Sequence, residues 1–258
     1  RHHAQTRSFQ LMRDLLELLG TPVAGESLIL GGPSGSGKTE AALNVAMSIA
    51  QDTTLRGMLC DLDVVKPYFR LRDMIRLLPI DITGRVQVVG PEHRLLHADI
   101  PIFPSNLHAL LADEKTVKVI DVGGDVAGIG AIAQFRETIL AKPYRFYILI
   151  NTCRPGMGNL PAMVRTFQGI VQGARLEVKG LISNTNLQDE TRASDVQAGF
   201  DLMQKLGEAT GLPVVAVLAD QARISALEPG LSPETRRLLA GIRVFNRIFD
   251  SVSSQTEF

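Results

Sequence analysis

GGPSGSGKTE, residues 31–40, lies between the apolar run SLIL (27–30) and the segment AALNVAMSIA (41–50). It contains the pattern GxxxxGK[ST], and its flanks predict a strand before the loop and a helix after it. In such a loop the backbone amides converge on a phosphate, the lysine reaches the terminal phosphates, and the threonine hydroxyl binds magnesium. We therefore expect a nucleotide phosphate to bind at Gly32, Ser34, Gly35, Ser36, Gly37, Lys38, Thr39 and Glu40.

Short apolar runs alternate with helical patterns along the rest of the chain. Apolar residues at spacings of three and four predict amphipathic helices at 40–50, 131–141 and 194–210. This alternation predicts an α/β fold with three layers, in which helices cover both faces of a mostly parallel sheet of about seven strands. The expected strands are 27–30, 55–61, 85–90, 117–122, 145–151, 177–183 and 213–219.

The same pattern suggests how the chain is divided. We expect a nucleotide-binding domain over residues 25–250, preceded by an N-terminal helix within residues 1–24 and followed by a flexible tail at 251–258. The N-terminal helical pattern stops at Gly20. A last helix is expected to begin near Ser232, which can cap it, with Pro233 in the first helical position.

Composition excludes several classes of protein. The 258 residues carry 27 basic and 27 acidic side chains, so there is no strong signal for nucleic acid or an anionic membrane. The two cysteines, Cys60 and Cys153, lack the spacing of a disulfide framework. No apolar run approaches the roughly 20 residues of a transmembrane segment, and no secretory signal is evident. These features predict a cytoplasmic protein.

Acidic residues follow two of the expected strands. In VIDVGGD (119–125), Asp121 ends a strand and is followed by Gly123 and Gly124. A carboxylate there can hold magnesium, and a glycine amide beyond it can meet the γ-phosphate. An ordinary turn after a strand is the alternative. We assign Thr39 and Asp121 to the metal, and Gly123 and Gly124 to the nucleotide.

The second acidic segment is CDLDVVKPYFRLRD, residues 60–73. Asp61 and Asp63 come directly after a strand, where ligands gather in parallel sheets. One carboxylate can orient the attacking water and the other can contact magnesium, and the pattern leaves open which does which. Lys38, Asp61 and Asp63 are therefore the candidate catalytic residues.

These motifs together resemble the SIMIBI class of P-loop NTPases, in the branch that contains MinD, ParA, the nitrogenase iron protein and CobQ/CobB-like proteins. Over about residues 25–220, the segments DLDVVKPYFRLRD, HADIP, DVGGD, NTCRP and GLISNTNLQDET are most similar to a group of uncharacterised bacterial ATP-binding proteins with the motif DxDxVNPYFRxR. The resemblance implies phosphate and magnesium roles for Lys38 and Thr39, the magnesium shell for Asp121, and the catalytic water for Asp61 or Asp63.

One departure from that branch concerns the loop. MinD and ParA relatives carry a second lysine that reaches across a nucleotide-sandwich dimer, and Pro33 stands in its place here. A dimer remains possible, but a sandwich mechanism is disfavoured. Lys66, Arg70 or Arg72 can supply the missing charge, or can simply lie on a solvated helix face.

The base site is predicted by resemblance as well. Guanine-specific relatives carry NKxD after a late strand, and in the matching SNTNL (183–187) Leu187 replaces the aspartate that pairs with guanine. Asn184 is a candidate adenine contact, although asparagine is also an ordinary turn former. The loop near Asp220 is the expected other wall, and in NTCRP (151–155) Asn151 and Arg154 also follow a strand at the ligand edge.

We therefore expect ATP and Mg²⁺ as cofactors, and slow ATP hydrolysis that works as a switch with an unidentified protein partner. The alternatives are a CobB-like ligase or transferase, in which ATP activates a small-molecule second substrate, and a module that senses ATP without hydrolysing it. Fold alone does not choose among these outputs.

Overall fold

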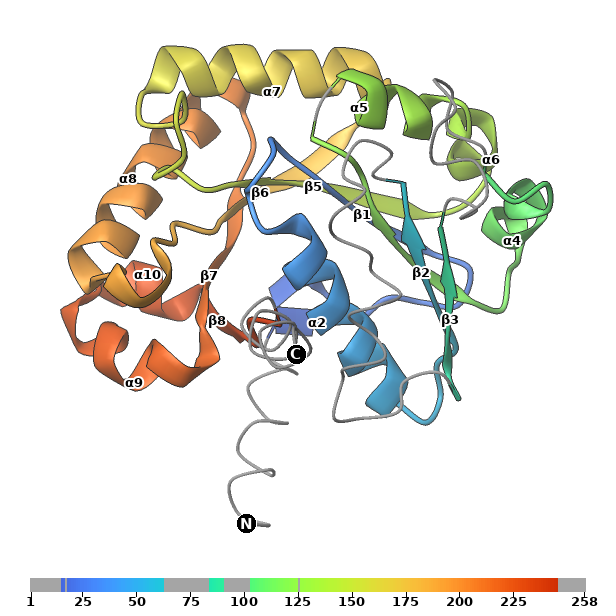
Figure 1. The fold of residues 1–258 in the computed structure, drawn as a ribbon, viewed down its shortest axis with the longest axis horizontal. Helices are drawn as coiled ribbons and strands as arrows, with labels where there is room; N and C mark the ends of the chain where they lie inside the picture. The colour runs from blue at the N-terminus through green and yellow to red at the C-terminus, as the bar shows by residue number, and fades with distance from the viewer. Residues whose placement is uncertain (1–14, 17, 63–83, 91–102, 125, 246–258) are drawn as a thin grey trace, which may run out of the picture.

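Eight parallel strands form one sheet in the order β3-β2-β4-β1-β5-β6-β7-β8 (Figure 1). The computed structural model describes residues 15–16, 18–62, 84–90, 103–124 and 126–245. The strands are β1 (Ser27–Gly31), β2 (Gly57–Asp61), β3 (Val86–Val89), β4 (Val117–Asp121), β5 (Tyr144–Ile150), β6 (Val178–Ser183), β7 (Val214–Asp220) and β8 (Leu239–Ile242).

The central strands are apolar along their whole length because both of their faces are covered. In β1, Ile29 faces one apolar cluster, whereas Leu28 and Leu30 face the other. In β5, Phe146 and Tyr147 divide in the same way between the two clusters. The sheet is therefore the middle of three layers, as the sequence predicts.

Helices cover the two faces unequally. One apolar cluster contains residues of α4, α5, α6, α7 and α8 (Figure 1). The other contains the buried apolar residues of α2 together with Leu15, Leu16 and Phe245. The helices are α2 (Lys38–Gln51), α4 (Leu107–Ala112), α5 (Val126–Ala133), α6 (Arg136–Leu140), α7 (Leu160–Ala174), α8 (Ala193–Thr210), α9 (Ile224–Leu227) and α10 (Pro233–Arg237), with the 3-10 turns η2 (Gln188–Glu190), η3 (Gln221–Arg223) and η4 (Glu228–Gly230).

All seven expected strands are confirmed, and β8 is an eighth that the sequence analysis missed. The helix expected near Ser232 is α10, which begins at Pro233 and is capped by the Ser232 side chain, an acceptor for the Thr235 amide. It ends at Arg237, and the chain then joins the sheet beside β7. Four residues, LAGI, are too short a run to distinguish from a continuing helix by period.

The helix expected at 131–141 is wrong as a single element, because α5 and α6 are separate helices with a break at Gln134 and Phe135. Phe135 is 4% exposed and packs edge-on against Phe103, so tertiary packing holds the break. Most of the expected N-terminal helix and the tail at 251–258 lie outside the described residues. Among the described residues, no helix has the length and apolarity needed to cross a membrane.

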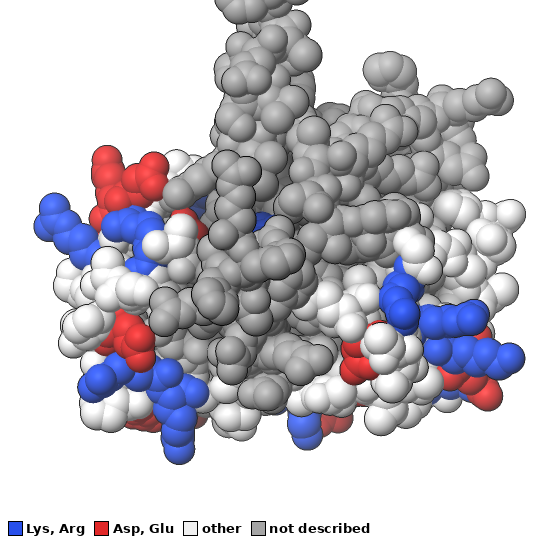
Figure 2. All heavy atoms as spheres, turned by 90° about the horizontal axis from the view of Figure 1, so that it is seen from below, with Lys and Arg blue, Asp and Glu red and all other residues white. Residues whose placement is uncertain are grey.

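Acidic and basic side chains are interspersed on the described part of the face shown in Figure 2. This arrangement agrees with the equal numbers of basic and acidic residues in the chain. The described part of this face therefore presents both signs of charge rather than one extended field.

The order of the strands creates a switch point in the connections at the centre of the sheet. The chain leaves β1 toward β2 on one side and leaves β5 toward β6 on the other, although β1 and β5 are neighbours. In open α/β sheets, ligands bind where the carboxyl ends of such diverging strands meet. The loop that follows β1 lies at this point.

Candidate functional site

The phosphate loop, residues 32–39, joins the end of β1 to the start of α2. Gly32 and Gly37 have φ values of 148° and 89°, which side chains rarely adopt. A Cβ atom on Gly32 would collide with the Leu149 carbonyl oxygen, and one on Gly37 would collide with the Asn184 side chain. The backbone conformation and the contacts from β5 and from the segment after β6 therefore favour glycine at both positions.

The first turn of α2 carries the lysine and threonine of the motif. Lys38 is 5% exposed, and its Nζ donates a hydrogen bond to the Pro33 carbonyl oxygen at 3.2 Å. The ammonium group thus lies against the loop that it is expected to serve. The N-terminus of the 14-residue α2 adds a partial positive charge at the same place.

The threonine contacts an acidic residue at the end of a strand, and a second acidic residue ends the neighbouring strand. The Thr39 hydroxyl donates to Asp121 Oδ2 at 2.5 Å, and Asp121, at the end of β4, is 1% exposed. Asp61, at the end of β2, is in register with Asp121. A hydroxyl and two carboxylates are thus gathered at one edge of the sheet, and oxygen ligands of this kind suit Mg²⁺.

The Cys60 thiol is buried beside the two carboxylates at this edge. Burial, followed by the nearby Asp61 and Asp121 carboxylates, raises the pKa of the Cys60 thiol well above its usual value. Cys60 therefore stays protonated and acts as a packing group in the core.

The turn after β4 contacts the phosphate loop directly. A Cβ atom on Gly124 would lie 2.5 Å from the Ser34 amide nitrogen and 2.7 Å from the Gly32 carbonyl oxygen. A Cβ atom on Gly128 of α5 would likewise meet the Gly123 Cα at 2.5 Å. The two glycines of the DVGGD motif are therefore packed between the loop and α5, and a shift in one backbone must move the other.

Residues after β5 and β6 are hydrogen-bonded to the phosphate loop. Asn184 Nδ2 donates to the Ser36 carbonyl oxygen at 2.8 Å, and the Asn151 side chain pairs with the backbone of Asn186. Ser36 Oγ and Asn184 Oδ1 are buried, and neither has a hydrogen-bond partner among the residues that the structure describes. Buried polar atoms are rarely left unpaired, so both atoms are suited to meet a polar group of a bound ligand or a water.

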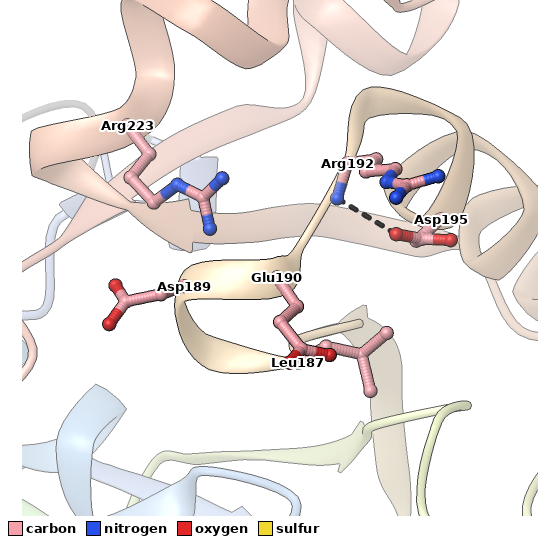
Figure 3. A pocket seen from close by; sticks show the side chains of 6 residues that line it. All are labelled: Leu187, Asp189, Glu190, Arg192, Asp195 and Arg223. Carbon is pink, nitrogen blue, oxygen red and sulfur yellow. Dashed lines mark hydrogen bonds between the residues drawn. The ribbon is translucent and has the colours of Figure 1, made fainter.

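A pocket of about 650 Å³ opens beyond these loops (Figure 3). One wall is the turn around η2, with Leu187 42% exposed at its edge, and the other is η3 after β7. Arg223 joins the walls, because its guanidinium donates to the Gln188 and Thr191 carbonyl oxygens at 2.6 and 2.8 Å. The lining residues are Leu187, Asp189, Glu190, Arg192, Asp195 and Arg223.

The loop near Asp220 contributes to this pocket indirectly. Asp220 Oδ1 accepts a hydrogen bond from the Ala222 amide and so caps η3, which carries Arg223. The sequence analysis did not single out Arg223. The sequence feature that could have pointed to Arg223 is its position just after the expected strand at 213–219.

Glu40 has a partner away from the loop. Its Oε2 accepts a hydrogen bond from the Phe245 amide at 2.9 Å, and Asn44, one turn further along α2, pairs with the backbone of Arg243. The Glu40 side chain thus holds the segment after β8, although the sequence analysis assigned this residue to the nucleotide. Asp63, Lys66, Arg70 and Arg72 lie outside the described residues.

The fold is shared with solved structures of FtsY proteins. FtsY from Mycoplasma mycoides has a TM-score of 0.53 at 12% identity, over 96% of this chain and 74% of that one. Chloroplast FtsY from Physcomitrella patens has a TM-score of 0.51 at 13% identity, over 94% and 72% of the two chains. The signal recognition particle receptor FtsY from Elizabethkingia anophelis, in complex with GDP, has a TM-score of 0.50 at 14% identity, over 93% and 69%.

These neighbours define the fold as that of the SIMIBI class of P-loop NTPases, in agreement with the resemblance drawn from the motifs. Because the sequence identity is low, the comparison shows a shared fold and does not show a shared function. No protein-family model matches the chain, and no curated protein is similar to it in sequence. The narrower resemblance to the MinD and CobQ/CobB branch remains a prediction.

Proposed function

We propose that this chain binds Mg-ATP in the phosphate loop and hydrolyses it slowly, as a switch. The observation that carries the proposal is the contact between the Thr39 hydroxyl and the Asp121 carboxylate, 2.5 Å apart, at the N-terminus of α2. These two oxygen groups come from segments 82 residues apart in the chain, and they meet beside Lys38. That is the arrangement needed to hold a metal-bound phosphate chain.

Each residue has a role in this proposal. The loop amides and Lys38 bind the phosphates and stabilise the charge that develops on them. Thr39 and Asp121 hold Mg²⁺, which would neutralise charge on the phosphate oxygens. Asp61 or Asp63 orients the attacking water; Asp61 is supported by its place beside Asp121 at the edge of the sheet.

ATP is proposed over GTP because of the pocket in Figure 3. Leu187, at the matching position for a guanine-reading aspartate, offers an apolar surface that is 42% exposed. Asp189 and Glu190 line the same pocket and can accept hydrogen bonds from the exocyclic amine of either purine, so the preference for ATP rests on Leu187. FtsY from Elizabethkingia anophelis is in complex with GDP, so GTP is the competing nucleotide that any test must include.

The switch is proposed because of how Gly124 packs. Its backbone touches the loop that would hold the terminal phosphate, so loss of that phosphate can relax the turn at 122–124. A protein partner or a small-molecule second substrate would respond to this change. A ligase or transferase output would instead show ATP turnover only when a metabolite is present.

The test measures binding and phosphate release with ATP and GTP, with and without magnesium. Variants Lys38→Ala, Asp61→Asn and Asp63→Asn are compared with Glu208→Gln, an exposed residue of α8. We expect ATP preference, slow phosphate release, loss of binding in Lys38→Ala, and loss of release without loss of binding in one aspartate variant. Absence of binding, or a clear GTP preference, would overturn the proposal, and binding without release would favour the sensor.

A further inference from the structure

Arg154 lies against the phosphate loop from the neighbouring strand. Its Nε donates a hydrogen bond to the Gly35 carbonyl oxygen at 3.2 Å. Gly35 follows β1 and Arg154 follows β5, so the contact joins the ends of two neighbouring strands that the chain leaves in opposite directions. This is the place in the sheet where a ligand is expected.

The backbone that carries Arg154 is well anchored. The Arg154 amide donates to the Asn151 carbonyl oxygen at 3.1 Å, and the Met157 amide donates to the Arg154 carbonyl oxygen at 2.9 Å. Asn151 is 3% exposed, and its side chain bonds to the amides of Cys153 and Asn186. The arginine therefore projects from a fixed turn rather than from a loose loop.

The contact also depends on a glycine in the loop. A Cβ atom on Gly35 would lie 2.7 Å from Arg154 Nε and 2.9 Å from its Cζ, and Gly35 has a φ of 76°. The guanidinium stem thus occupies the space that a side chain at position 35 would fill. Among the described residues, its two terminal NH₂ groups have no hydrogen-bond partner.

We propose that Arg154 binds the phosphate chain of the nucleotide, an inference that rests on the proposed function. Pro33 contributes no charge at the position where a second lysine would stand, and Arg154 brings a cation to the same loop from β5. A guanidinium presents a planar set of donors that matches phosphate oxygens in a bidentate manner. The remaining donors of Arg154 are available for this contact once Nε is held by Gly35.

The experiment measures affinities for ATP, ADP and AMP in the full chain. The variants are Arg154→Ala, Arg154→Lys and Arg165→Ala, the last a matched exposed arginine on α7. We expect Arg154→Ala to lower the affinity for ATP by about tenfold, the affinity for ADP by less and the affinity for AMP least, because the contact is with the phosphates. Arg154→Lys should recover part of the ATP affinity, and Arg165→Ala should leave all three affinities unchanged.

Two results would overturn the inference while leaving the proposed function intact. In the first, ATP binds Arg154→Ala as tightly as it binds the unaltered chain. In the second, all three nucleotides lose affinity by the same factor, which would place Arg154 on the part that they share and away from the β- and γ-phosphates. Failure of the unaltered chain to bind ATP would instead remove the proposed function itself. Thermal unfolding of each variant separates a lost contact from a lost fold.

Discussion

Gly124 shows how a single residue can link two motifs that are far apart in the chain. It has room for no side chain, because backbone atoms of Gly32, Pro33 and Ser34 lie 2.5–2.7 Å from where its Cβ would be. These neighbours are backbone atoms and cannot rotate away as a side chain could. The glycine is therefore required by the contact between the turn and the phosphate loop.

Gly124→Ala should therefore weaken nucleotide binding by about tenfold or more, since the methyl group must push the phosphate loop out of its geometry. Gly130→Ala is the matched control, because Gly130 is exposed on α5 with nothing within 4 Å of its Cβ direction. Nucleotide titration of both variants, with circular dichroism to check folding, makes the comparison. Equal affinities in the two variants would contradict the expectation.

Leu187→Asp should shift the preference toward GTP. The substituted carboxylate would stand where guanine-specific relatives place theirs, and one charged hydrogen bond is worth about a tenfold change in the ratio of the two affinities. Leu187 is 42% exposed, so the fold should tolerate the change. Competition binding of ATP against GTP measures the ratio, with Leu187→Asn as the uncharged control. An unchanged ratio would mean that this turn does not contact the base.

At the scale of elements, α8 holds the loops after β5 and β6 in place. Gly199 faces these loops, where Thr152 Oγ1 and Thr185 Oγ1 are hydrogen-bonded at 2.9 Å. A Cβ atom at position 199 would collide with Thr185 Oγ1. Close approach of the helix therefore supports both loops that contact the phosphate loop.

Gly199→Ala should destabilise the protein by about 1–3 kcal/mol, because overpacking outweighs the better helix propensity of alanine. Gly169→Ala should have the opposite sign and stabilise by about 0.5–1 kcal/mol, since Gly169 is exposed on α7 with nothing within 4 Å. Urea unfolding of the two variants measures both free energies. If both variants were stabilised, the packing of α8 on the loops would not be as close as described.

At the scale of the whole molecule, the candidate site is assembled from the loops that follow β1, β4, β5 and β6 and from Asp61 at the end of β2. No single segment contains it, so a ligand that binds there holds most of the sheet together. Binding should therefore raise the stability of the entire domain rather than order one loop.

Mg-ATP at about 100 times its Kd should add ~2.7 kcal/mol to the free energy of unfolding and raise Tm by about 5–10 °C. Removing magnesium with a chelator should reduce the shift, because Thr39 and Asp121 would lose the ion that joins them to the phosphates. Thermal scans with ATP, and with ATP plus chelator, test this. Lys38→Ala serves as the control, and a full shift in that variant would show that ATP binds elsewhere.

Much of the fold follows from short-range patterns. The seven apolar runs predict seven strands because a residue's preference for a doubly buried strand is visible in its immediate neighbours. The break between α5 and α6 and the strand β8 were missed, because each depends on packing against distant segments. The phosphate loop was predictable because its signal is also local: its glycines, lysine and threonine are consecutive or nearly so.

The amino-acid sequence by itself determined the strand, the glycine loop and the helix that begins with Lys38 and Thr39, since these depend on local backbone freedom and spacing. Only the tertiary structure decided which partners those residues meet. It brought Asp121 to Thr39, Gly124 and Arg154 to the loop, and Phe245 to Glu40. The physical reason is that strand order sets these contacts, and local patterns do not encode the order in which parallel strands pair.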